Sequence, residues 1–217
     1  AWTLSQGIGI SIDLEVANEL YRKAAELGFT DSQVVLGNNL IAGIGCTPDI
    51  TLGIFWLEKS SNEGHTYADF LLSRVHIDGI GVTQNQQLGM AYLEKSASNG
   101  YSEAQRILGG ARLAGRFCEV NVGEGLALLN RAIEQSNIEA MYDLGKVYET
   151  GVYIEKDHLL SAKYLLMAAE GGHVKAMHDI GVVYFNGIGV PKDVAQANKW
   201  YLRAANLGSH LSSYCLG

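Results

Sequence analysis

The chain has 217 residues and a mass of 23.4 kDa; 47% of its residues are hydrophobic and 18% are charged. The net charge of −7 disfavours a nucleic-acid partner, because a phosphate backbone attracts basic surfaces. The sequence contains no run of eighteen or more apolar residues, so no membrane span is expected.

The tripeptide Gly-Ile-Gly recurs along the chain at a fixed interval. It occupies residues 7–9, 43–45, 79–81 and 187–189, and the steps between these places are 36 residues or three times 36. A nucleotide-binding loop occurs once in a domain, whereas a structural turn recurs with its repeat. The glycines therefore predict repeat turns, and we expect no nucleotide and no other cofactor.

In chain order, this register gives a partial repeat, five complete repeats and the start of another. The repeats are 1–30, 31–66, 67–102, 103–138, 139–174, 175–210 and 211–217. We expect them to form a single solenoid domain over residues 1–217. Both ends of the sequence fall inside a repeat, so we expect the chain to be cut from a longer one with further repeats.

Each repeat is predicted to form two helices. In "EAMYDLGKVYETG", the apolar residues Ala140, Leu144 and Val147 recur at helical spacing, and Gly151 suits the left-handed residue that ends a helix. A good N-cap residue follows six positions later and predicts the start of the second helix. These N-caps are Asp13, Asp49, Asn85, Asn121, Asp157 and Asp193.

Glycine also recurs in the middle of the first helix, where it costs about 1 kcal/mol relative to alanine. These glycines are Gly37, Gly109, Gly145, Gly181 and Gly217. Such a cost is reasonable where two helices pass too closely for a side chain. The fold class predicted is all-α: a solenoid of 36-residue helix-turn-helix repeats, in which neighbouring repeats supply one another's core.

The pattern in "KAMHDIGVVYFNGIGVPKDVAQANKWYLRAANLG", residues 175–208, is similar to the Sel-one-like repeat, a relative of the tetratricopeptide repeat. The resemblance covers essentially the whole chain and implies an α/α right-handed superhelix. Phe117 and Tyr153 depart from the pattern, because they stand where glycine is usual. We expect the turns there to differ, and their aromatic rings to serve either packing or contact with a partner.

The resemblance implies a protein-interaction scaffold, in a family that is mostly bacterial. Export to the periplasm or secretion is favoured by the resemblance, with the cytoplasm as the alternative. Two functions compete: an adaptor that engages host or envelope proteins, and an immunity protein that blocks a secreted toxin such as a type VI lipase effector.

The sequence shows no catalytic or metal-binding constellation. It lacks HExxH, CxxC and GxSxG motifs, and His65 and His173 lie three repeats apart. One branch of the family is cysteine-rich and linked to penicillin binding, with two cysteines in a repeat, but no repeat here contains two. We therefore expect no enzyme, and an enzyme of that branch is the outside alternative.

In helix-pair solenoids of this kind the first helices line the concave side. Repeat positions 4 and 8 are expected to point into this groove by helical geometry. The candidate partner-binding residues are Phe70, Arg74, Arg106, Tyr142, Lys146, His178 and Tyr214. These aromatic and basic residues favour a groove for a protein or peptide, with plain solenoid lining as the alternative. Lys95 and Arg131 on second helices are expected to have no role in it.

Overall fold

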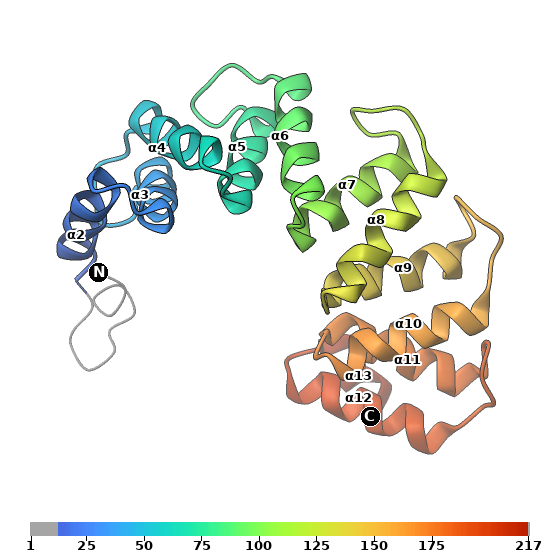
Figure 1. Cartoon of the computed structure of the whole chain (residues 1–217). Helices are drawn as coiled ribbons and strands as arrows, with labels where there is room; N and C mark the ends of the chain where they lie inside the picture. Colours follow the sequence, from blue (N-terminus) through green and yellow to red (C-terminus); the bar gives the residue numbers. More distant parts are fainter. Residues whose placement is uncertain (1–12, 217) are drawn as a thin grey trace. The chain divides into compact units, whose positions relative to one another are not determined.

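The computed structural model describes residues 13–216 of the chain, so Gly7 and Gly217 lie outside the described part. Over these residues the protein is helical, without strands, as the repeat pattern predicts (Figure 1). The helices are α2 (Leu14–Glu26), α3 (Thr30–Ala42), α4 (Ile50–Asn62), α5 (Thr66–Asp78), α6 (Gln86–Ser98), α7 (Ser102–Ala114), α8 (Val122–Glu134), α9 (Ile138–Thr150), α10 (His158–Glu170), α11 (Val174–Asn186), α12 (Val194–Asn206) and α13 (His210–Leu216).

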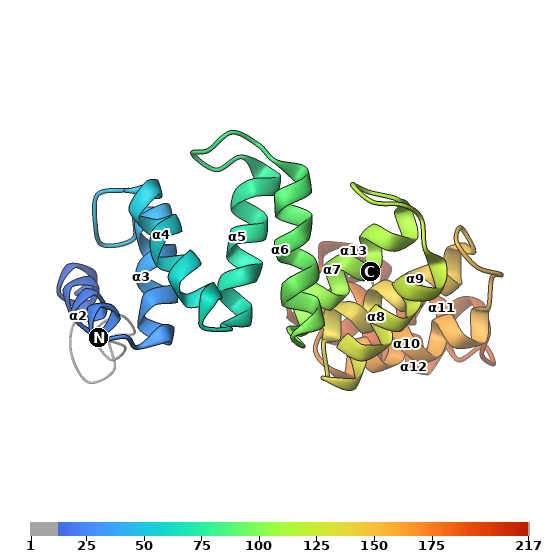
Figure 2. The same cartoon turned by 45° about the horizontal axis from the view of Figure 1, so that its top comes forward.

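The chain divides into two compact units, residues 1–104 and 105–217. Helices α2 to α6 belong to the first unit, and α8 to α13 belong to the second together with most of α7. Within each unit the helices pair in chain order, α3 with α4 and α5 with α6, then α9 with α10 and α11 with α12 (Figure 2). Each unit thus has the helix-pair arrangement predicted for the repeats.

The helix boundaries follow from local capping. Each second helix begins at its predicted N-cap; Asp49 Oδ1, for example, accepts a hydrogen bond of 3.0 Å from the backbone of Leu52. The first helices end at left-handed glycines, among them Gly43 at φ 68° and Gly187 at φ 73°. The sequence prediction of caps and stops is therefore confirmed for the described residues.

The mid-helix glycines mark close helix crossings. A Cβ atom on Gly37 would lie 2.8 Å from the carbonyl oxygen of Gly53, and one on Gly53 would lie 2.8 Å from that of Gly37. A Cβ on Gly181 would lie 2.6 Å from the ring of Tyr201. Side chains cannot occupy such short distances, so the predicted close approach of paired helices is confirmed.

The turn after α7 corrects one expectation. Phe117 has φ 61°, in the same left-handed region as Gly45 at φ 64° and Gly81 at φ 65° in the equivalent turns. The backbone therefore keeps the repeat's turn although the residue is aromatic, which is an uncommon conformation for a bulky side chain. Tyr153 is not among the left-handed residues of the described part, so only its turn differs as predicted.

An ion pair with a buried carboxylate joins the two helices of one repeat in the first unit. The carboxylate of Asp69 on α5 is fully buried and accepts a 2.9 Å hydrogen bond from Lys95 Nζ on α6. Lys95 also donates to the backbone oxygen of Ser61 at 2.9 Å. Lys95, which is expected to have no role in partner binding, thus has a structural role, because its ammonium group pairs with a buried carboxylate.

Candidate functional site

Two of the predicted partner-binding residues lie on α5 in the first unit. Phe70 is only 7% exposed, and its ring packs against Tyr67 and Tyr101 with centroids 6.1 and 5.1 Å apart. The Phe70 side chain is therefore packed within its own repeat and offers little surface to a partner, contrary to the expectation. Arg74 is exposed, and its side chain has no ion-pair partner within residues 13–216.

The other predicted residues lie on the first helices of the second unit: Arg106 on α7, Tyr142 and Lys146 on α9, His178 on α11 and Tyr214 on α13. We call the surface formed by these five residues the first-helix face. Arg106, Tyr142, Lys146 and His178 are half-buried, whereas Tyr214 is 88% exposed. The first-helix face thus combines four half-buried side chains with one exposed aromatic ring.

Each cation on the first-helix face is held by an acidic residue that the sequence reasoning missed. Arg106 forms an ion pair of 2.7 Å with Asp143 in the next repeat. Lys146 lies 3.3 Å from Asp179, again one repeat further on, and also pairs with Glu149 on its own helix. Asp143 and Asp179 occupy the same repeat position, directly after position 4. Each aspartate follows its cation by about one repeat, 37 residues for Asp143 after Arg106 and 33 for Asp179 after Lys146. An acid at this spacing from a cation is the sequence signal that could have indicated the pairs.

The pairing around Tyr142 sets the ionisation of this part of the face. The Tyr142 hydroxyl donates a hydrogen bond of 3.2 Å to Asp179. Burial, then the negative charge of Asp179, raises the pKa of Tyr142 to about 12, against an opposing effect of Lys146. Burial alone would lower the pKa of Lys146, but the hydrogen bond and charge of Glu149 and the charge of Asp179 raise it overall. At neutral pH the phenol is therefore neutral and the ammonium group charged.

The hydrogen bond between Tyr142 and Asp179 can be tested by titrating the Tyr142 hydroxyl. Because the pKa of Tyr142 is raised above its value of 10.0 in the unfolded chain, its contribution to stability is present below pH 10 and is lost as the pH rises towards 12. Replacing Asp179 with asparagine removes a negative charge, so we expect the Tyr142 pKa to fall. NMR titration of the tyrosine ring signals, with Tyr142→Phe as the assignment control, measures it; an unchanged pKa in Asp179→Asn would contradict the contact.

His178 and Tyr214 lie at the end of the face formed by α11 and α13. Nδ1 of His178 is 2.9 Å from the hydroxyl of Ser212, and its ring lies against Tyr201 with centroids 5.6 Å apart. A pocket of about 470 Å³ next to it is lined by residues that include Tyr142, Leu211 and His210. His178 is therefore both packed and accessible from one side.

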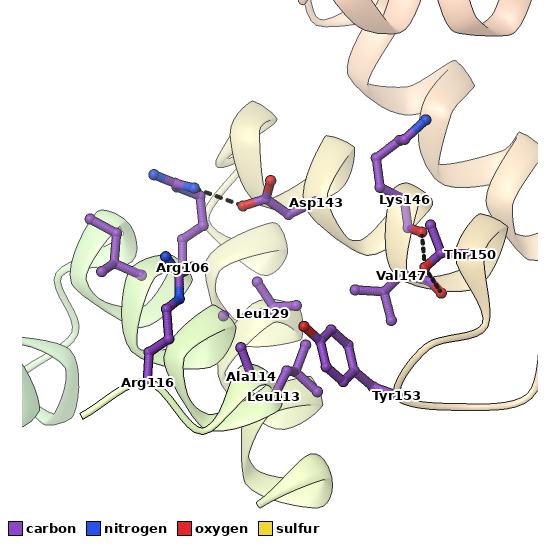
Figure 3. A pocket seen from close by; sticks show the side chains of 12 residues that line it. Arg106, Leu113, Ala114, Arg116, Leu129, Asp143, Lys146, Val147, Thr150 and Tyr153 are labelled. Atoms are coloured by element: carbon purple, nitrogen blue, oxygen red, sulfur yellow. Dashed lines mark hydrogen bonds and ion pairs between the residues drawn. The ribbon is translucent and has the colours of Figure 1, made fainter. Parts of the chain in front are cut away.

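A second pocket opens between α7 and α9, on the part of the face that carries Arg106 and Lys146 (Figure 3). Its volume is about 490 Å³. The lining residues are Arg106, Ile107, Gly110, Leu113, Ala114, Arg116, Leu129, Asp143, Lys146, Val147, Thr150 and Tyr153. Arg116, which follows the helix-ending Gly115, was not predicted; only its position in the turn between the two helices of its repeat could have indicated it.

The described residues offer no obvious site for metal chemistry. Among residues 13–216, no group of three or more histidine, cysteine, aspartate or glutamate side chains is arranged to hold a metal ion. The cysteines Cys46, Cys118 and Cys215 are all free thiols. No helix in this range is both long and apolar enough to cross a membrane. The groups that the face presents are charged side chains, hydrogen-bonding groups and aromatic rings.

Two solved structures of bacterial proteins are similar to this chain over nearly its whole length. A protective antigen from uropathogenic Escherichia coli, c5321, has 25% sequence identity and a TM-score of 0.87, with 99% of this chain and 46% of that one covered. A Sel1 repeat protein from Oxalobacter formigenes has the same identity and TM-score, with 99% and 62% covered. The chain thus spans about half to three fifths of the length of these two structures.

The immunity protein Pa5087 from Pseudomonas aeruginosa is a more distant relative in fold. It has 20% identity and a TM-score of 0.59, with 90% of this chain and 75% of that one covered. No curated protein matches the sequence significantly.

The repeats themselves are matched by the model of the Sel1 repeat. The matched segments are 1–29, 30–65, 66–101, 102–137, 138–173 and 174–209, a register one residue earlier than the one taken from the glycines. Six consecutive repeats account for nearly all of the sequence, and the chain therefore belongs to the Sel1 repeat family.

Proposed function

We propose that this protein is a non-enzymatic adaptor that binds a partner protein through the first-helix face of its second unit. The observation that carries the proposal is the 490 Å³ pocket on that face, which is lined by the cations Arg106, Arg116 and Lys146 and by a single acidic residue, Asp143. Sel1 repeats typically bind proteins. Arg74, exposed on α5, is a separate contact of the first unit in this proposal.

The ion pairs of the face favour specificity over raw affinity. A partner carboxylate has to compete with Asp143 for Arg106, and with Asp179 and Glu149 for Lys146. Charged groups in such arrangements select partners and accelerate encounter more than they add net affinity. Apolar area must then come from aromatic side chains, and Tyr214 supplies the most exposed ring of the face.

The experiment is a charge-removal test on a partner captured by the intact chain and identified by mass spectrometry. The double variant Arg106→Gln with Lys146→Gln should weaken binding about tenfold and reduce its dependence on salt. Glutamine removes the positive charge without placing a like charge beside Asp143 or Asp179. Binding is measured by isothermal titration calorimetry, with circular dichroism to verify that the helices are intact.

The matched control is Arg131→Gln with Lys199→Gln, which removes the same charge from exposed positions on α8 and α12. These two residues have no ion-pair partner in residues 13–216. If the control pair weakened binding as much as the first pair, the partner would have to occupy the second helices instead. Pa5087, which is similar in fold, is an immunity protein. A toxin is therefore the alternative partner in this proposal, and it would bind the same face.

A further inference from the structure

Two adjacent glycines in the middle of α7 have opposite surroundings. A Cβ atom on Gly109 would lie 3.0 Å from the carbonyl oxygen of Gly125 and 3.1 Å from Leu129, so helix packing explains that glycine. A Cβ atom on Gly110 would meet nothing within 4 Å. Glycine inside a helix is unfavourable relative to alanine, and no contact of the fold compensates for it at Gly110.

The open space beside Gly110 is the pocket between α7 and α9, which Gly110 lines. Equivalent positions in the other described repeats carry side chains: Asn38, Arg74, Lys146 and Val182. The missing side chain of Gly110 therefore opens a hollow on the first-helix face. Leu113, Leu129 and Val147 supply apolar surface to it, and the ring of Tyr153 reaches towards Leu113 and Leu129 from the loop after α9 (Figure 3).

Arg116 is the cation at this pocket that forms no ion pair within residues 13–216. Arg116 is exposed, and its side chain has no hydrogen bond or ion pair in the described part of the chain. Its guanidinium end points towards Arg106 (Figure 3), so two like charges lie on the same side of the hollow. Arg106 already pairs with Asp143, which leaves the charge of Arg116 without compensation. An incoming carboxylate would relieve this imbalance.

We propose that the pocket over Gly110 receives one large apolar side chain of the partner, flanked by carboxylates that pair with Arg116. This inference rests on the proposed function and names the chemistry of its partner: an acidic segment with an aromatic or large aliphatic anchor. A pocket of about 490 Å³ falls in the range of small ligand sites. An aromatic ring gains much buried area at low entropic cost, and the cations at the pocket fit acidic flanks.

The test uses a fluorescein-labelled peptide, Glu-Glu-Leu-Phe-Glu-Glu, acetylated and amidated at its ends, and measures its dissociation constant by fluorescence anisotropy. Gly110→Leu fills the hollow and should raise the dissociation constant at least about tenfold. Because leucine favours helix more than glycine does, the same variant should raise Tm by about 2–4 °C. Arg116→Gln should weaken binding and reduce its salt dependence.

Gly123→Leu is the matched control. Gly123 is likewise a helical glycine with free space beside it: on α8, an added Cβ would meet only Asn121 Oδ1 at 3.8 Å, and Gly123 does not line the pocket. This variant should gain the same thermal stability and bind the peptide as the unaltered protein does. A second peptide with glutamine in place of each glutamate should bind at least about tenfold more weakly.

Three results would each overturn the inference: equal binding by Gly110→Leu and the unaltered protein, equal binding of the Glu and Gln peptides, or no binding of the Glu peptide at about 1 mM. None of them decides the proposed function, which depends on the captured partner and on Arg106 and Lys146. One combination of results separates the two proposals. If Arg106→Gln with Lys146→Gln loses partner binding and Gly110→Leu binds the partner fully, the first-helix face is the binding surface but the pocket over Gly110 is not occupied.

Discussion

Replacing Lys95 with methionine should lower the free energy of unfolding by about 2–3 kcal/mol. The substitution leaves the carboxylate of Asp69 without its cation, although that carboxylate is fully buried and its second oxygen, Oδ2, has no hydrogen-bond partner. We expect a loss below the about 3–5 kcal/mol typical of broken buried pairs, because the Lys95 side chain is 41% exposed and water screens the pair. Urea unfolding followed by circular dichroism measures the loss.

Two further variants separate this pair from a general effect of losing a lysine. Lys23→Met removes an exposed lysine from α2 of the same unit and should change stability by less than about 0.5 kcal/mol. The double variant Lys95→Met with Asp69→Leu should recover much of the loss, since buried pairs are replaced well by apolar residues. A Lys95→Met protein with an unaltered unfolding curve would mean that Asp69 does not depend on this cation.

Gly189→Ala should lower the free energy of unfolding by about 3–5 kcal/mol, the largest effect that we expect from a single substitution. Gly189 has φ 74°, where an L side chain is strained, and a Cβ atom there would lie 2.2 Å from the carbonyl oxygen of His158. The backbone at the start of α10 would have to move to admit even one methyl group. Thermal and urea unfolding both report the loss.

Gly208→Ala is the control that isolates the close approach. Gly208 is also left-handed, at φ 91°, but an added Cβ would meet nothing within 4 Å. It should therefore cost only the backbone strain, about 1–2 kcal/mol. Equal losses in the two variants would show that the close approach to His158 adds nothing to the cost of the backbone strain.

Local rules made most of the fold predictable. Asp193 caps α12 by accepting a hydrogen bond of 2.9 Å from the backbone N–H of Gln196, and Gly187 ends α11 in the left-handed region. Both features depend only on residues a few positions apart, so the sequence displays them directly. The close crossing at Gly181 was predictable from its recurrence, because a glycine that returns at the same mid-helix position of several repeats indicates a close approach of two helices.

The predictions that failed concern contacts between residues far apart in the sequence and one backbone angle. Phe70 has the helical position of a groove residue, but its ring is buried against Tyr101, which lies after the second helix of the same repeat. Asp143 neutralises Arg106 from 37 residues away, a partnership that composition along one face cannot reveal. Phe117 keeps a left-handed angle that its residue type disfavours, because the surrounding turn determines the backbone.

The contact between Arg106 and Asp143 spans 37 residues, and those from His65 to Asp31 and from Lys95 to Ser61 each span 34. A chain whose tertiary partners are never far away in sequence closes only short loops as it folds, so its contact order is low and its folding is fast. During synthesis, each repeat therefore finds its first partner as soon as the following 36 or so residues have left the ribosome, well before the chain is complete.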